Sequence, residues 1–315
     1  MDVFPFFVGC GRSGTTLFRA IFDSHPNLAI PGESHFIVHL APNRRRYETG
    51  AGFDVEAFLA DLLPHPRFRL WGLAEDRVRA ALRERPPSNL ADAVRTVFAE
   101  YAAAQGKGRY GDKTPGYVSH LPLVAALFPE ARFVHILRDG RDVALSYLDV
   151  SFGPDTLERA ALHWKRFVER GRQAGSRLGP DRYVEVRYED LLGDPEKIVR
   201  SLCGFIDIEF QPGMFRYPER AAEVASGSAF PEAHGRLALP PTKGLRDWRS
   251  QMSANDVAAF ELLAGDLLSD LGYERSMARA GMRARARAAG KRLSIEAGRV
   301  VHGIGKRARI AVGRR

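Results

Sequence analysis

The chain has 315 residues, 45% hydrophobic and 27% charged, a composition typical of a globular protein with a sizeable core. No apolar run reaches the roughly 18 residues of a membrane-spanning helix, so none is expected. An apolar strand pattern begins near Val3, which leaves no room for a signal peptide. The two cysteines and the lack of an Asn-x-Ser/Thr sequon favour a reducing cytosol, and we expect a cytoplasmic protein.

The net charge of +9 is concentrated near the C-terminus. Residues 275–315 contain thirteen Lys and Arg and one acid, Glu296, so they carry +12 and the first 274 residues carry −3. We interpret this basic tail as a solvated terminal extension. The alternative is a basic amphipathic helix that contacts an anionic membrane or an acidic partner. No aromatic pattern or motif accompanies the charge, so no nucleic acid partner is predicted.

The first segment has the order strand, glycine-rich loop, helix. The apolar run at 4–8 is followed by Gly9-Cys-Gly-Arg-Ser-Gly-Thr-Thr16 and then by apolar residues at helical spacing. Glycines let the backbone N–H groups turn inward and bind an anion beside the positive end of a helix. Thr15 stands where an ATP-binding loop has its lysine, which favours a 5′-anion over ATP with magnesium. For the loop alone, the alternative is an ordinary glycine-rich turn.

Residues 37–108 are predicted to form a helical insertion, because apolar residues recur there at spacings of three and four between prolines. Strand and helix patterns then alternate: strands at 132–137 and 183–186, helices from 140, at 195–205 and at 253–271. This alternation predicts an α/β fold, a P-loop-type central parallel sheet flanked by helices, with ligands at the carboxyl ends of its strands. We interpret residues 1–274 as one domain.

A second candidate phosphate site begins at the end of a strand. Arg138 directly follows the strand at 132–137, and Ser146 lies eight residues further along, in the next helix. Two helical turns can bring a hydroxyl back beside a guanidinium at the strand end, and such a pair suits a phosphate monoester. A surface turn with an incidental serine is the alternative for this segment alone.

Together the two segments resemble the sulfotransferase family, whose members take a sulfuryl group from 3′-phosphoadenosine 5′-phosphosulfate (PAPS). The matching stretches are Arg12-Ser-Gly-Thr-Thr-Leu17 and Arg138-Asp-Gly-Arg-Asp-x3-Ser146, and the resemblance covers about residues 3–274. It implies that the first loop holds the 5′-phosphosulfate and that the second pair holds the 3′-phosphate. The residues with these implied roles are Arg12, Ser13, Gly14, Thr15, Thr16, Arg138 and Ser146.

Two further segments resemble the tyrosylprotein and bacterial branch of this family. Pro31-Gly-Glu33 matches the segment with the catalytic base, so the resemblance implies that Glu33 takes the proton of the acceptor. His35 is the rival base, since other branches use histidine, and on an extended segment both side chains would face one side. Gly111-Asp-Lys-Thr-Pro115 implies that Lys113 approaches the bridging oxygen, where negative charge grows as the S–O bond breaks.

Two later segments extend the donor site by resemblance. Tyr188 matches a tyrosine that contacts adenine, with helix capping or core packing as the alternative. Lys243-Gly-Leu-Arg-Asp-Trp248-Arg249 resembles the loop over the 3′-phosphate, but its spacing is one residue shorter and Arg249 replaces a lysine. Lys243 and Arg249 are therefore candidate clamps. No Cys/His cluster indicates a metal, and none is expected.

The sequence thus predicts a sulfotransferase that moves sulfuryl from PAPS to an acceptor hydroxyl, or less favourably an amine. Glu33 acts as base, while Arg12 and Lys113 offset charge on the departing phosphate. The alternatives are a P-loop kinase, disfavoured by the missing loop lysine, a non-catalytic nucleotide-binding scaffold, and an adaptor recruited to membranes by its tail. Carbohydrate, lipid, small-molecule and peptide tyrosine acceptors stay open, as does the oligomeric state. The insertion is expected to shape the acceptor pocket.

Overall fold

The computed structural model describes residues 2–220 and 247–276, together with 281–282, 285–286 and 289–290. By its internal contacts the chain divides into two compact units, Met1–Arg138 with Phe167–Lys243 and Asp139–Arg166 with Gly244–Arg315. The candidate clamp Lys243 and most of the basic tail lie outside the described residues. Within the described part of the chain, no helix has the length and apolar character needed to cross a membrane.

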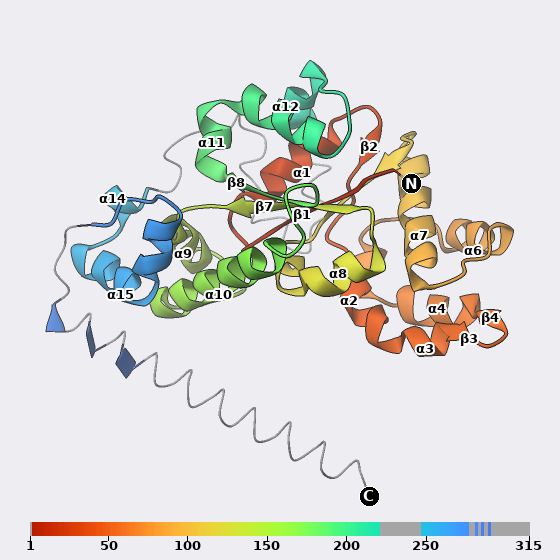
Figure 1. Cartoon of the computed structure of the whole chain (residues 1–315), viewed down its shortest axis with the longest axis horizontal. Coiled ribbons are helices and arrows are strands. Elements are labelled where there is room, and N and C mark those ends of the chain that lie inside the picture. Colours follow the sequence, from red (N-terminus) through yellow and green to blue (C-terminus); the bar gives the residue numbers. More distant parts are fainter. Residues whose placement is uncertain (1, 221–246, 277–280, 283–284, 287–288, 291–315) are drawn as a thin grey trace, which may run out of the picture. The chain divides into compact units, whose positions relative to one another are not determined.

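A four-stranded parallel sheet lies at the centre of the first unit (Figure 1). Its strands, in spatial order, are β6 (Asp112–Lys113), β1 (Phe4–Gly9), β7 (Ala131–Leu137) and β8 (Tyr183–Arg187). Phe7 on β1 is opposite Lys113, and Gly9 is opposite Ile136. The register therefore puts the ends of β6, β1 and β7 at one edge, where the glycine-rich loop starts. The predicted α/β class with a parallel central sheet is confirmed.

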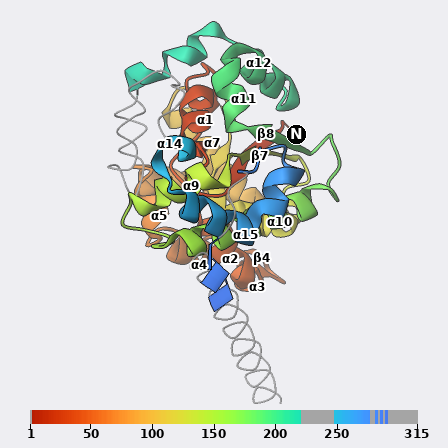
Figure 2. The same cartoon turned by 90° about the vertical axis from the view of Figure 1, so that its left-hand side faces the viewer.

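Helices cover both faces of this sheet (Figures 1 and 2). One face carries α1 (Thr15–Asp23), α11 (Tyr188–Gly193), α12 (Pro195–Phe205) and the 3-10 segment η3 (Pro212–Arg220). The other carries α2 (Phe36–Leu40), α7 (Leu90–Ala104), η2 (Pro115–His120) and α8 (Leu121–Leu127). Side chains alternate along β1, because Phe4, Phe6 and Val8 pack into the second layer and Phe7 packs into the first. Both layers bury continuous apolar cores.

The predicted insertion is largely helical. It contains η1 (Ala41–Asn43), α3 (Arg44–Tyr47), α4 (Val55–Leu62), α5 (Pro66–Arg69), α6 (Glu75–Glu84) and α7. Asp54 and Asn89 cap α4 and α7 by accepting hydrogen bonds from backbone N–H groups three residues on. A small antiparallel pair, β3 (Glu48–Thr49) with β4 (Gly52–Phe53), was not predicted. The parallel pair β2 (Leu28–Ala29) with β5 (Arg109–Tyr110) joins the segments on either side of the insertion.

The second unit is helical. It contains α9 (Gly140–Leu148), α14 (Trp248–Gln251), α15 (Ala254–Asp270) and the first part of α10 (Leu157–Gly175), whose second part belongs to the first unit. The Asp139 and Ser253 side chains cap α9 and α15. The helix predicted at 253–271 is therefore present as α15.

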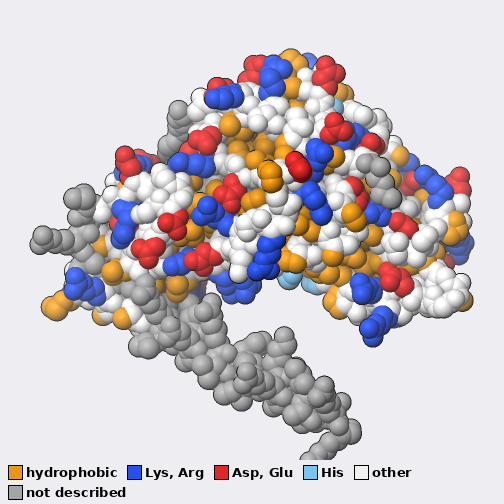
Figure 3. All heavy atoms as spheres, viewed as in Figure 1, with side chains coloured by type: hydrophobic (Ala, Val, Ile, Leu, Met, Phe, Trp, Pro, Cys, Tyr) orange, Lys and Arg blue, Asp and Glu red, His pale blue; other side chains and the backbone are white. Residues whose placement is uncertain are grey.

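Charged side chains of both signs are interspersed on the face drawn in Figure 3, and hydrophobic side chains also reach the surface there. The positive excess of the sequence does not gather in one patch on this face. It belongs to residues 275–315, most of which lie outside the described residues.

Candidate active site

The loop between β1 and α1 has a backbone suited to an anion. Gly9, Arg12 and Gly14 have φ values of 157°, 68° and 87°. A β-carbon at Gly9 would lie 2.6 Å from the Ile136 carbonyl oxygen, so only glycine fits there. The helix α1 that follows has no side-chain cap at its N-terminus. The partly positive N-terminus of α1 therefore adjoins the loop and favours the binding of an anion there.

Ser13 gives this loop a buried polar group. The side chain is 1% exposed, and its hydroxyl has no hydrogen-bond partner among the described residues. An unpaired buried hydroxyl costs free energy unless a ligand satisfies it. Thr15 and Thr16 follow as the first two residues of α1. The loop and the first turn of α1 therefore carry hydroxyl groups beside the N-terminus of a helix.

Arg138 lies at the rim of the same loop. Its Nη1 donates a hydrogen bond to the Arg12 carbonyl oxygen at 3.3 Å, and its guanidinium lies 4.7 Å from the centre of the Tyr188 ring. Tyr188 in turn packs against Gly14, where any β-carbon would overlap its ring. The structure therefore brings Arg12, Gly14, Arg138 and Tyr188 together, although they span more than half the sequence.

Glu33, Lys113 and His35 form a second polar cluster. Lys113 Nζ lies 2.8 Å from Glu33 Oε1, and His35 Nε2 lies 2.9 Å from Glu33 Oε2, so both carboxylate oxygens have a partner. Burial alone would raise the pKa of the Glu33 carboxyl, but the Lys113 charge and hydrogen bonds from His35 and Lys113 hold that pKa well below its usual range. Burial lowers the pKa of Lys113, and Glu33 opposes that shift. The cluster contains an ionised carboxylate paired with a buried ammonium.

The segment with Glu33 is not extended, because His35 has φ of 50°. Glu33 and His35 nevertheless meet, through a turn rather than through the strand alternation that the sequence suggested. Lys113 is 3% exposed and sits on β6 opposite Phe7, two residues before Gly9. The cluster therefore lies at the sheet edge that feeds the glycine-rich loop.

Residues that the sequence did not single out hold this segment in place. Ser34 N donates to Thr114 Oγ1 at 2.9 Å, and the Ser34 hydroxyl lies 2.8 Å from the Tyr117 hydroxyl. On the other side, Trp71 Nε1 donates to the Gly32 carbonyl oxygen at 2.9 Å. The backbone is thus fixed on both sides of Glu33. Thr114 and Tyr117 lie within four residues of Lys113, so their position near the site could have been predicted. No pattern in the sequence marks Trp71.

Asp112 precedes Lys113 on β6 and is fully buried. Its Oδ2 accepts a hydrogen bond from Thr114 Oγ1 at 3.2 Å, while Oδ1 has no partner among the described residues. Burial raises the pKa of Asp112 to about 6. Ionisation of this buried carboxyl therefore lowers the stability of the folded protein.

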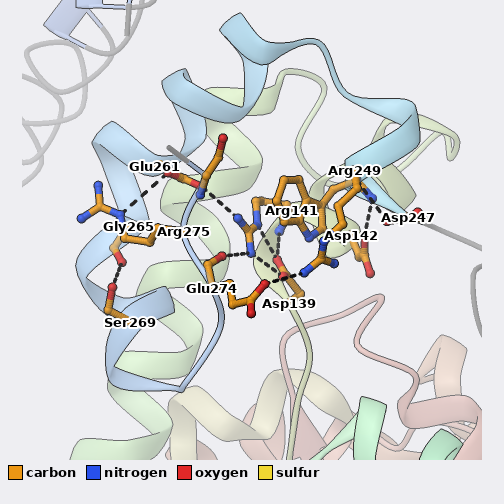
Figure 4. Close-up of polar contacts among 12 residues, drawn as sticks. Asp139, Arg141, Asp142, Asp247, Arg249, Glu261, Gly265, Ser269, Glu274 and Arg275 are labelled. Carbon is orange, nitrogen blue, oxygen red and sulfur yellow. Dashed lines mark hydrogen bonds and ion pairs between the residues drawn. The ribbon is translucent and has the colours of Figure 1, made fainter. Parts of the chain in front are cut away.

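The second unit carries the other candidate donor-binding residues, Ser146 and Arg249. Ser146 is buried on α9. Arg249 lies 4.6 Å from the Trp248 ring centre and 3.4 Å from Glu274 (Figure 4). The expected pairing of Ser146 with Arg138 joins residues of different units and stays a prediction.

Arg141 organises this unit (Figure 4). It is fully buried, bonds Asp139 and Glu261 at 2.7 and 2.8 Å, and stacks on the Trp248 ring at 3.6 Å. Trp248 N also donates to Asp142 at 2.9 Å. The start of α14, which carries Arg249, is therefore tied to the start of α9.

Three further histidines contact other residues of the protein. His135 Nδ1 lies 2.6 Å from the Tyr183 hydroxyl, and burial lowers the pKa of His135 to about 3. His25 Nε2 lies 2.9 Å from the Glu209 carbonyl oxygen, and His163 lies 3.3 Å from the Tyr147 hydroxyl. Within the described residues, no three His, Cys, Asp or Glu side chains are placed to hold a metal ion.

Comparison with known proteins gives a consistent family. The model of the sulfotransferase family matches residues 5–212. A putative protein-tyrosine sulfotransferase of Caenorhabditis briggsae is 25% identical over 284 residues, 85% of this chain and 88% of that protein. The nodulation protein NoeE of Sinorhizobium fredii is 24% identical over 296 residues, 86% of this chain and 66% of that protein.

The fold agrees with this family. The sulfotransferase domain of the curacin biosynthetic pathway superposes with a TM-score of 0.61 at 20% identity, over 88% of this chain and 99% of that domain. The chain belongs to the sulfotransferase family, since the family model matches well over half of it. It is a transferase that moves sulfuryl groups, as its sequence predicted.

Proposed function

We propose that the protein takes sulfuryl from PAPS, bound at the glycine-rich loop and Arg138, and passes it to an acceptor hydroxyl with Glu33 as base. The observation that carries this proposal is the ion pair between Glu33 and Lys113, 2.8 Å apart at the edge of the sheet that feeds the loop. A base and a cation for the leaving group are thus already in one place.

The loop residues fit the 5′ end of the donor. The buried Ser13 hydroxyl, the Thr15 and Thr16 hydroxyls and the uncapped start of α1 offer hydrogen bonds to phosphate and sulfate oxygens. Arg138 fits the 3′-phosphate, because its guanidinium sits at the loop rim on the Tyr188 ring. Ser146, Lys243 and Arg249 complete this proposed set from the rest of the chain.

Lys113 and Glu33 change partners when the donor binds. In the structure the ammonium of Lys113 is held by Glu33 Oε1. The bridging oxygen of the donor attracts that ammonium, and the carboxylate oxygen is released. Because Lys113 lowers the pKa of Glu33, its departure makes Glu33 a stronger base.

The transfer step moves a sulfuryl group from the donor to the acceptor and a proton from the acceptor to Glu33. The acceptor oxygen forms a bond to sulfur, and its proton passes to Glu33 Oε1. The bond between sulfur and the bridging oxygen breaks, and its electron pair stays on the phosphate of 3′-phosphoadenosine 5′-phosphate (PAP). Lys113 and Arg12 offset the charge that grows on this phosphate. No metal is needed in this scheme.

The test combines turnover with product binding. Lys113→Ala and Glu33→Gln should lower turnover by at least about 100-fold, as loss of charge stabilisation or of the base does in other enzymes. Calorimetry should find PAP binding largely retained in both variants. Lys197→Ala, an exposed lysine of the same unit, is the matched control and should behave as wild type. Unimpaired turnover in Lys113→Ala would remove Lys113 from the mechanism.

The acceptor and the location of the protein are part of the proposal. A relative from Drosophila melanogaster is named as a protein-tyrosine sulfotransferase, so a tyrosine peptide is the first acceptor to assay with radiolabelled donor, beside carbohydrate, lipid and small phenol acceptors. Both cysteines are buried and form no disulfide among the described residues, which is compatible with the proposed cytoplasm. Cell fractionation tests the location.

A further inference from the structure

His35 has a strained backbone. It is one of three non-glycine residues with positive φ in the described part of the chain, with Arg12 and Asp207. The left-handed region is unfavourable for a residue with a β-carbon, and it persists only where the surroundings enforce it. Arg12 belongs to the glycine-rich loop, and Asp207 lies in an exposed turn that is distant in the sequence from His35. His35 contacts the proposed base Glu33.

The contacts around His35 explain the turn. Ser34 before it is anchored to Thr114 and Tyr117, and the Phe36 N–H donates to the Ser34 carbonyl oxygen at 2.5 Å. The backbone therefore folds back at His35, and the imidazole returns toward Glu33. The left-handed conformation is what places His35 Nε2 2.9 Å from Glu33 Oε2.

The direction of this hydrogen bond follows from the charge of Glu33. Its pKa is held well below the usual range, so the carboxylate is ionised and can only accept. His35 Nε2 must then carry the hydrogen and donate it. Nε2 is therefore not available to take a proton from the acceptor while this bond exists.

We propose that His35 is a positioning residue that orients Glu33 for proton abstraction; this rests on the proposed function. Once the donor has drawn Lys113 away, the His35 hydrogen bond still holds Oε2. The carboxylate keeps its orientation, and Oε1, just released by Lys113, faces the acceptor. Without His35 the carboxylate rotates freely and spends less time in the reactive geometry.

Two variants separate this role from that of a base. Glutamine at position 35 carries an amide N–H where the imidazole has Nε2–H, but it cannot accept a proton at neutral pH. Glycine removes the donor and also relieves the strain. We expect His35→Gly to lower kcat by about 10- to 100-fold, and His35→Gln to restore kcat to within a few-fold of wild type. The donor KM and PAP affinity should stay unchanged in both.

Asp207→Gly is the matched control for strain, because it relieves the same backbone conformation far from the site in the sequence. It should raise the melting temperature by about 2 °C and leave kcat unchanged. His35→Gly should not lower the melting temperature, since strain relief offsets the lost hydrogen bond. A merely structural histidine would show the opposite, a lower melting temperature with normal kcat.

The outcomes are distinct. If His35→Gln is as slow as His35→Gly, the imidazole itself takes part in proton transfer, and the positioning role is wrong. Wild-type kcat in His35→Gly would show that His35 has no role. A wild-type protein that binds PAP but transfers no sulfuryl to any acceptor would refute the proposed function instead, before any variant is made.

Discussion

The buried carboxylate of Asp112 should make the protein less stable as it ionises. Burial raises the pKa of Asp112 from 3.8 to about 6, and one of its oxygens has no partner among the described residues. The perturbation that tests this is Asp112→Asn. The amide has nearly the same shape, is neutral at every relevant pH, and can still accept the hydrogen bond of Thr114.

The sign follows from proton binding. The folded protein holds the Asp112 proton more tightly than the unfolded chain does, so stability falls as pH rises from about 4 to about 6. A shift of about two units at about 1.4 kcal/mol per unit gives a cost of about 3 kcal/mol above pH 7. At pH 4.5 the cost is only about 1 kcal/mol, because Asp112 is still mostly protonated in the folded state.

Urea unfolding at pH 7.5 and pH 4.5 measures this difference. Asp112→Asn should unfold at higher urea than wild type at pH 7.5, and the gain should shrink at pH 4.5. Asp181→Asn, at an exposed position of the same unit, is the control and should leave the urea midpoint unchanged at both pH values. Equal gains at both pH values, or none at pH 7.5, would refute the burial argument.

The stabilised variant should also be less active. The Asp112 charge raises the pKa of Lys113, against the lowering caused by burial. With asparagine in its place, less of Lys113 is protonated at high pH, so kcat should fall more steeply there than in wild type. If Asp112→Asn gains stability and loses activity at high pH, the buried charge of Asp112 supports activity at the expense of stability.

Three further substitutions test the site and its support. Gly14→Ala overlaps Tyr188 and should cost about 1–2 kcal/mol in urea unfolding and weaken PAP binding in calorimetry. Arg141→Ala removes the buried guanidinium that pairs with the buried Asp139 and Glu261 carboxylates and should cost about 3–5 kcal/mol, measured the same way. Trp71→Phe loses the bond to Gly32 and should lower kcat at unchanged donor KM.

The parts that the sequence predicted depend on short-range patterns. The strand–loop–helix order at residues 4–23 and the arginine after β7 follow from apolar runs and punctuating glycines. Because parallel strands end at one edge, the approach of Arg138 to the glycine-rich loop follows from topology alone. The roles of all the candidate site residues, including Ser146, Lys243 and Arg249, remain predictions.

The parts that were missed depend on contacts between distant residues. Trp71 reaches Gly32 across 39 positions, and Tyr117 reaches Ser34 across 83. No periodicity marks such pairs, because each depends on how segments distant in the sequence pack together. The turn at His35 was also missed, since a histidine with positive φ has no signature in the sequence.

The proposed base Glu33 is held by both Lys113 and His35, and a carboxylate held in this way is a weak base. In the proposed mechanism, donor binding removes Lys113 and leaves His35, so the base is strengthened and stays oriented. Because one lysine serves both the base and the leaving group, acceptor activation depends on the donor being present. The order of substrate binding then follows from a single ion pair.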